Sequence, residues 1–139
     1  MKTLKQKQLG VRKKHSLSFR RYVSFEGSGD SIKEYLDLNA WEIREYIESL
    51  WEMGMDWENY KKDWVIDHIV PLRCFDIRSN SQMKLCWNHL NFAPKFISDN
   101  HEKGASIYNT LLELMELPQT PVVKLLIEHS QKRTFFSIY

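Results

Sequence analysis

The clearest hydrophobic pattern in the chain lies between residues 38 and 51. Apolar side chains recur there at intervals of three and four residues, which is the spacing of one face of an α-helix. They are Leu38, Trp41, Ile43, Tyr46, Ile47, Leu50 and Trp51. Asn39 and Glu42, three residues apart, have the spacing of a capping box at a helix start. The pattern therefore predicts an amphipathic helix over residues 40–52, with its aromatic side chains in the core rather than in a platform for stacked bases.

A strand and its partner are predicted further along the chain. Residues 64–70 form a β-branched and aromatic run that Pro71 closes, which is typical of a β-strand. Residues 90–93, just before Pro94, are expected to form a short second strand antiparallel to the first. The mixed polarity of residues 72–85 favours a loop between the two strands.

Three helical segments are expected after the second strand. The first starts at Ser98 or Asp99, where the acidic side chains have capping-box spacing, and ends or bends at Gly104. Apolar residues at helical intervals predict a second helix that stops before Pro118. Thr120, which precedes a proline, is a suitable start for a third helix.

Composition is typical of a small soluble protein. The 139 residues, 42% of them hydrophobic, are enough for one domain with a modest core. No run approaches the roughly 20 apolar residues that a membrane helix needs, so we expect a soluble, cytosolic protein without a membrane partner. Cys74 and Cys86 are too few for a four-cysteine zinc site, and both are expected to be buried thiols.

Charge is distributed unevenly along the chain. Residues 1–25 carry eight basic side chains and no acidic one, so this segment has a charge of +8, while the rest of the chain is about −6. Residues 1–30 are polar and contain turn-forming glycines, which predicts a flexible basic arm. Such an arm binds nucleic-acid phosphates in a salt-sensitive way by releasing counterions. The charge by itself leaves a solvated tail and a nucleic-acid-binding arm equally open.

Four polar residues define the candidate site, and they are Asp67, His68, Asn91 and Asn100. The predicted strand, loop, strand and helix bring them together although they span 34 residues of sequence. A lone Asp-His pair is more often an ordinary surface acid beside a histidine without a special role. The spacing to the two asparagines, with Pro94 between them, makes a functional site the better interpretation. His89 and His101 lie inside this motif but are expected to be incidental.

Four runs of the sequence carry a resemblance to a known family. They are W-V-I-D-H-I-V-P at 64–71, N-H-L-N-F-A-P at 88–94, N-H-E-K-G at 100–104 and, upstream, G-M-D-W-E-N-Y at 54–60. In these runs the chain resembles the HNH endonucleases of the ββα-metal (His-Me finger) class, including the phage and homing types.

The resemblance implies a fold and a domain organisation. The expected fold is α+β, with a ββα-metal core made of a two-stranded antiparallel hairpin and a short helix, surrounded by additional helices. Residues 1–30 then form the DNA-contacting arm and residues 31–139 a single nuclease domain. Its motif core covers residues 64–104, and the C-terminal helices cover residues 105–139.

The resemblance also implies a role for each candidate residue. His68 is the general base, for which an unperturbed pKa of about 6.5 is suitable near neutrality. Asp67 and Asn100 hold one divalent metal ion together with water and phosphate oxygens. Asn91 has a positioning role, because its amide bridges the backbone across the hairpin and holds the loop with His68. Phosphate contacts are expected from basic side chains, namely Lys103, Arg12, Lys13, Lys14, Arg20 and Arg21.

Two departures from the family pattern bear on the metal. The third motif residue is Asn100 where other members have histidine, and Phe92-Ala93-Pro94 stands where many have Leu-Gln-Pro. Oxygen ligands suit hard cations that keep part of their water shell. We therefore expect Mg²⁺, with Mn²⁺ as the second choice, instead of zinc or nickel, and we expect no structural zinc.

The leading hypothesis is a metal-dependent endonuclease, encoded by a phage or mobile element, that hydrolyses the phosphodiester bonds of double-stranded DNA as a nickase or a double-strand cutter. Two alternatives stay open. One is a non-catalytic DNA-binding or packaging accessory that keeps the HNH fold and works with a partner such as a terminase. The other is a toxin-like nuclease without sequence preference.

Overall fold

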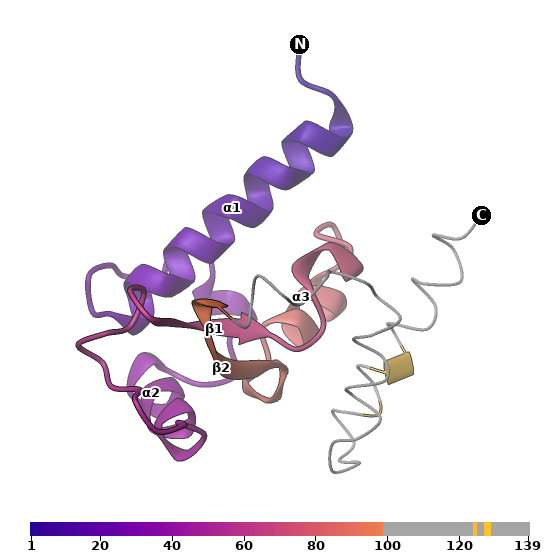
Figure 1. Cartoon of the computed structure of the whole chain (residues 1–139). Coiled ribbons are helices and arrows are strands. Elements are labelled where there is room, and N and C mark those ends of the chain that lie inside the picture. Colours follow the sequence, from indigo (N-terminus) through magenta and orange to yellow (C-terminus); the bar gives the residue numbers. More distant parts are fainter. Residues whose placement is uncertain (99–123, 125–126, 129–139) are drawn as a thin grey trace.

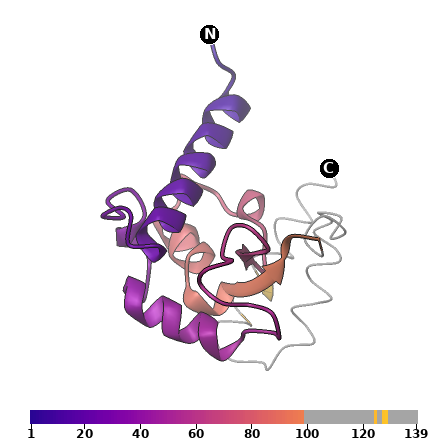
Figure 2. The same cartoon turned by 60° about the vertical axis from the view of Figure 1, so that its left-hand side comes forward.

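The computed structural model describes residues 1–98, 124, 127 and 128. Its α-helices are α1 (Leu4–Val23), α2 (Ala40–Ser49) and α3 (Asn80–Cys86), and its strands are β1 (Trp64–His68) and β2 (Phe92–Phe96). Single turns of 3₁₀-helix, η1 to η3, occupy Lys33–Tyr35, Leu72–Cys74 and His89–Asn91. In Figures 1 and 2 the three helices surround the hairpin, and the N-terminal half of α1 extends away from it. The predicted α+β class is confirmed.

The two strands form an antiparallel hairpin, as predicted. The register runs from Trp64 opposite Phe96 to His68 opposite Phe92. The second strand occupies Phe92–Phe96 instead of the predicted 90–93, and Pro94 lies inside it, opposite Ile66. A proline is tolerated there because each strand of a two-stranded sheet has one edge without a ladder partner, so the missing N–H breaks no necessary bond.

An α-helix occupies most of the segment that was expected to be a flexible arm. Thr3 and Gln6 form a capping box at the start of α1, each side chain bonded to the other residue's backbone N–H. Near the other end, the side chains of Phe19 and Val23 are buried in the core. These two apolar residues are too few to produce a clear periodic signal in such a basic segment, but they fix the helix to the body of the protein.

Helix α2 begins where the sequence predicts and ends earlier than expected, at Ser49. The capping box is present, with Asn39 accepting from the Glu42 N–H and the Glu42 carboxylate accepting from the Asn39 N–H. The prediction that the whole aromatic stripe is core is wrong for Trp41, whose side chain is 72% exposed. The centroid of its ring instead lies 4.5 Å from the centroid of the Phe25 ring, which is also on the surface.

A short helix, α3, lies within the segment that was predicted to be a loop. Ser79 caps its start by accepting from the Gln82 N–H at 3.3 Å. Met83 and Cys86, three residues apart, are buried on one face. Two turns are too few to show a hydrophobic period in the sequence, so the mixed polarity of residues 72–85 does not distinguish this helix from a loop.

The core lies between the three helices and the hairpin. Its largest fully buried side chains come from all of these elements, and they are Trp64, Trp87, Phe75, Phe92, Ile32, Ile43, Ile47, Met83, Val23 and Val70. Cys74 and Cys86 are buried free thiols, as predicted, and burial raises the pKa of the Cys86 thiol. Every helix in the described part of the chain is too short or too polar to span a bilayer.

Candidate active site

The start of β1 is held by the segment that precedes it. The side chains of Asp56 and Asn59 each accept a hydrogen bond from the other's backbone N–H, at 3.0 and 2.9 Å. The indole N–H of Trp64 donates to the Asp56 carbonyl at 2.7 Å and to Asn59 Oδ1 at 2.8 Å. The D-W-E-N run therefore anchors Trp64, the first residue of the strand. Asp67 and His68 lie at the opposite end of the same strand.

Asp67 and His68 are the last two residues of β1, opposite Ala93 and Phe92 of β2. Consecutive side chains of a strand point to opposite faces of the sheet. The two residues therefore occupy one end of the hairpin but different faces of it. Both side chains are partly buried.

Asn91 joins this end of the hairpin to α3. Its side chain is fully buried; Oδ1 accepts from the Val70 N–H at 2.8 Å, and Nδ2 donates to the carbonyls of Val70 at 3.2 Å and Cys86 at 2.9 Å. Its own carbonyl accepts from the Ile69 N–H at 2.8 Å. The predicted bridge across the backbone is therefore present, and it fixes the two residues that directly follow His68.

The ring of His68 lies on the core side of the hairpin between two aromatic side chains. It is edge-on to Trp87, with centroids 4.5 Å apart, and to Phe92, with centroids 5.4 Å apart. Its Nε2 atom is buried and has no hydrogen-bond partner in the described part of the chain. This desolvation lowers the pKa of His68 to about 3, because a charged imidazolium is unfavourable among apolar groups. His68 is therefore neutral at pH 7.

The low pKa of His68 makes stability depend on pH. Between pH 6.5 and about 3, the unfolded chain binds a proton at this residue that the folded chain does not bind, so the free energy of unfolding falls as the pH falls. The slope is at most about 1.4 kcal/mol per pH unit, and it disappears about one pH unit above the unfolded pKa of 6.5.

In the variant His68→Phe this slope is absent. Urea unfolding of both proteins at several pH values is expected to show the variant gaining about 1–2 kcal/mol relative to the wild type between pH 7 and 5. A constant difference across that range would show that His68 titrates normally in the folded protein.

The predicted metal ligands are only partly within the described residues. Asp67 is in the hairpin, whereas Asn100 and the basic Lys103 lie outside the described part of the chain. Ile97 and Ser98, directly after β2, are helical, at the position where the short helix of the motif is predicted to start. Among the described residues there is no group of three His, Cys, Asp or Glu side chains arranged to hold a metal ion.

The residues between 12 and 21 that are predicted to contact phosphate lie on α1 and fall into two groups. Four have exposed side chains, namely Lys13, Lys14, Arg20 and Arg21. Arg12 is half-buried, and its guanidinium donates to the Phe75 carbonyl at 3.3 Å. Its contact joins α1 to the segment before α3, a structural role that the charge pattern did not indicate.

A contact between distant parts of the sequence supports the turn before β2. The carboxylate of Asp37 accepts from the His89 N–H at 2.9 Å and from Asn88 Nδ2 at 3.1 Å, and it lies 2.5 Å from His89 Nδ1. The His89 ring is also edge-on to Tyr46 of α2. His89, which was expected to be incidental, thus helps to hold the turn containing Asn91. No local spacing signals this pair, because 52 residues separate its members.

Comparison with known proteins gives one informative similarity. The chain is 33% identical over 101 residues to a protein of Acanthamoeba polyphaga mimivirus that carries the name "Uncharacterized protein L426". The alignment covers 71% of this chain and 44% of the viral protein. The chain therefore spans less than half the length of this curated relative, whose name states no activity. No family model matches the chain, and no solved structure matches it.

Proposed function

We propose that this protein is a metal-dependent endonuclease of the HNH type, which hydrolyses phosphodiester bonds of DNA. The observation that carries the proposal is the position of Asn91. Its amide holds the backbone just after His68 through three buried hydrogen bonds, which is the positioning role expected of the middle asparagine in this family. The antiparallel hairpin, with Asp67 and His68 at its end, supports the same assignment.

His68 serves as the general base in this proposal. Burial keeps the imidazole neutral throughout the physiological pH range, so its lone pair is free to accept a proton from the attacking water, but a pKa of about 3 makes it a weaker base than a free imidazole. The aromatic rings of Trp87 and Phe92 limit the orientations of the imidazole, so that the accepting atom is held in one place.

Asp67 and Asn100 are the residues that would hold the metal ion. Both offer oxygen donors, which suits Mg²⁺ or Mn²⁺, and Asp67 lies beside the proposed base on the other face of the strand. Such an ion supplies positive charge that stabilises the phosphate and the leaving oxygen during hydrolysis. Asp67 and His68 are consecutive residues of β1, so the strand itself keeps them close to each other.

The proposal is tested by cleavage of supercoiled plasmid DNA in the presence of Mg²⁺. We expect nicked or linear product, no cleavage in EDTA, and a loss of about 100-fold or more in rate for Asp67→Ala. Glu45→Ala is the matched control, because Glu45 is an exposed carboxylate on α2 and has no role in the proposed site. Mn²⁺ binding, followed by electron paramagnetic resonance, is expected to weaken in the first variant and to stay unchanged in the second.

Two results would contradict the proposal. Undiminished cleavage by Asp67→Ala would remove Asp67 from the metal site. Binding of DNA without cleavage of single- or double-stranded substrates, with any of the divalent metals, would instead favour the accessory protein that only contacts DNA. If the protein does cleave DNA, sequencing of the cut ends separates a site-specific enzyme, which cuts at one position, from a toxin-like nuclease, which cuts at many.

A further inference from the structure

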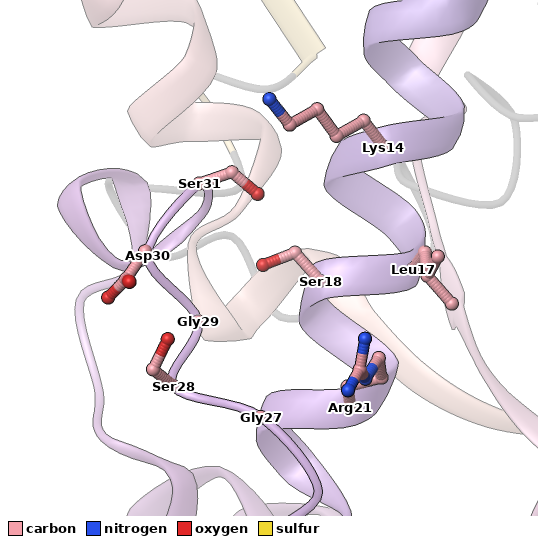
Figure 3. A pocket seen from close by; sticks show the side chains of 9 residues that line it. All are labelled: Lys14, Leu17, Ser18, Arg21, Gly27, Ser28, Gly29, Asp30 and Ser31. Carbon is pink, nitrogen blue, oxygen red and sulfur yellow. The ribbon is translucent and has the colours of Figure 1, made fainter.

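Helix α1 and the loop that follows it border an open groove of about 430 Å³ (Figure 3). The polar side chains around it are Lys14, Ser18 and Arg21 from the helix and Ser28, Asp30 and Ser31 from the loop. The three helix residues are spaced by four and three positions, so they lie on one face of α1. Phe19 and Val23, on another face, are buried in the core. The groove therefore lies on a side of α1 that the core does not occupy.

The loop is held against the helix by backbone geometry. The Glu26 N–H donates to the Arg21 carbonyl at 2.8 Å, and an Arg21 guanidinium nitrogen lies 3.3 Å from the Glu26 carbonyl. Gly29 has a φ of +76°, and a Cβ at this position would lie 2.8 Å from the ring of Tyr22. Only glycine fits there without strain. The close approach of the loop to the helix at Gly29 sets the positions of Ser28 and Ser31.

The charges and hydroxyl groups of the groove suit a phosphate group. In Figure 3 the Lys14 ammonium and the hydroxyls of Ser18 and Ser31 point into the space between helix and loop, while the Asp30 carboxylate points away from α1. Lysine and arginine side chains with neighbouring hydroxyl donors are the usual partners of phosphate oxygens in nucleic-acid complexes. Helix α1 contains no acidic residue that would oppose an anion.

We propose that this groove binds a backbone phosphate of DNA, through Lys14 and Arg21 with the serine hydroxyls as additional donors. The choice of DNA as the ligand rests on the proposed nuclease function. Four exposed basic residues of α1 then fall into two sets. Lys14 and Arg21 bind the phosphate in the groove, whereas Lys13 and Arg20, each one position earlier, lie on a different face of the helix and add only general positive charge. Arg12 belongs to neither set, because it is half-buried and does not line the groove.

The adjacent pairs of basic residues provide a matched comparison. Lys14→Gln with Arg21→Gln removes two charges from the groove, and Lys13→Gln with Arg20→Gln removes two charges from the same helix outside it. Glutamine is a good helix former, so α1 is expected to persist in both double variants. Circular dichroism checks this. Binding of a short labelled DNA duplex is measured by fluorescence anisotropy in EDTA, where metal-dependent cleavage is absent.

We expect the groove variant to bind the duplex about tenfold more weakly or worse, with the slope of affinity against salt reduced by about two. The control variant is expected to lose less than about threefold. Equal losses in the two double variants would overturn the proposal, because α1 would then act only as a diffuse positive charge. Since binding is measured without cleavage, a groove variant that loses affinity supports the groove even if the wild type proves not to be a nuclease.

Titration with inorganic phosphate distinguishes DNA from a small phosphate ligand. The expected result is that phosphate at millimolar concentrations, at constant ionic strength, neither saturates the groove in NMR spectra nor displaces the duplex. Saturable shifts of the Lys14 and Gly29 amides, together with unchanged duplex binding by the groove variant, would overturn the assignment to DNA and identify a site for a free phosphate compound.

Discussion

Replacing His68 by phenylalanine is expected to abolish DNA cleavage without destabilising the protein. A general base contributes about 10²–10⁴-fold to the rate, so a loss of that size follows if His68 accepts the proton of the attacking water. The ring of phenylalanine retains the edge-on packing against Trp87 and Phe92. It also removes a buried nitrogen that has no partner among the described residues, so the free energy of unfolding at pH 7 should stay within about 1 kcal/mol or rise.

The matched control for this variant is His15→Phe. His15 is also partly buried among aromatic rings, 5.7 Å from Tyr35 and 6.4 Å from Trp87, and burial lowers its pKa as well. It lies on α1, however, and has no role in the proposed chemistry. Plasmid cleavage and urea unfolding of both variants separate a catalytic role of the histidine from a role in packing against aromatic rings. Cleavage by His68→Phe at the wild-type rate would show that His68 is only a packing residue.

Replacing Asn91 by alanine is expected to produce a large loss of stability. The side chain is fully buried, and its loss leaves three backbone groups without a partner: the N–H and carbonyl of Val70 and the carbonyl of Cys86. Each unpaired buried group costs about 1–3 kcal/mol, with partial relief by relaxation, so we expect a total of about 3–5 kcal/mol. Chemical denaturation followed by tryptophan fluorescence measures this directly.

Asn80→Ala provides the comparison for Asn91→Ala. Asn80 is an exposed asparagine in the first turn of α3, and its replacement is expected to change the free energy of unfolding by less than about 0.5 kcal/mol. A variant Asn91→Ala that does not fold at all agrees with the large predicted cost. A loss of less than 1 kcal/mol would mean that the bridge is not needed to hold the end of β1.

The parts of the fold that the sequence predicts correctly are those with local signals. The start of α2 follows from Asn39 and Glu42, which are three residues apart and form the capping box. The strand β1 follows from a β-branched run that ends before a proline. The role of Asn91 in bridging the backbone came from resemblance to a family, and the hydrogen bonds of its amide agree with it.

The parts that the sequence does not predict depend on contacts between distant residues. Helix α1 has few apolar side chains, and only its packing through Phe19 and Val23 distinguishes it from a solvated basic tail. The hydrogen-bonded contact between Asp37 and His89 joins segments 52 residues apart. The low pKa of His68 is likewise a tertiary effect, because Trp87 comes from the end of α3, nineteen positions further along the chain.

The bridge made by Asn91 also bears on when activity arises during synthesis. A nascent chain that ends before residue 91 already contains Asp67 and His68, but it lacks the side chain that binds Val70 and Cys86. It also lacks β2, which pairs with β1 from residue 92 onward. Under the proposed function, a ribosome-bound fragment of this length contains Asp67 and His68 without their arrangement, and it also lacks Asn100, the second proposed metal ligand. Cutting activity then appears only after the hairpin and α3 have left the ribosome together.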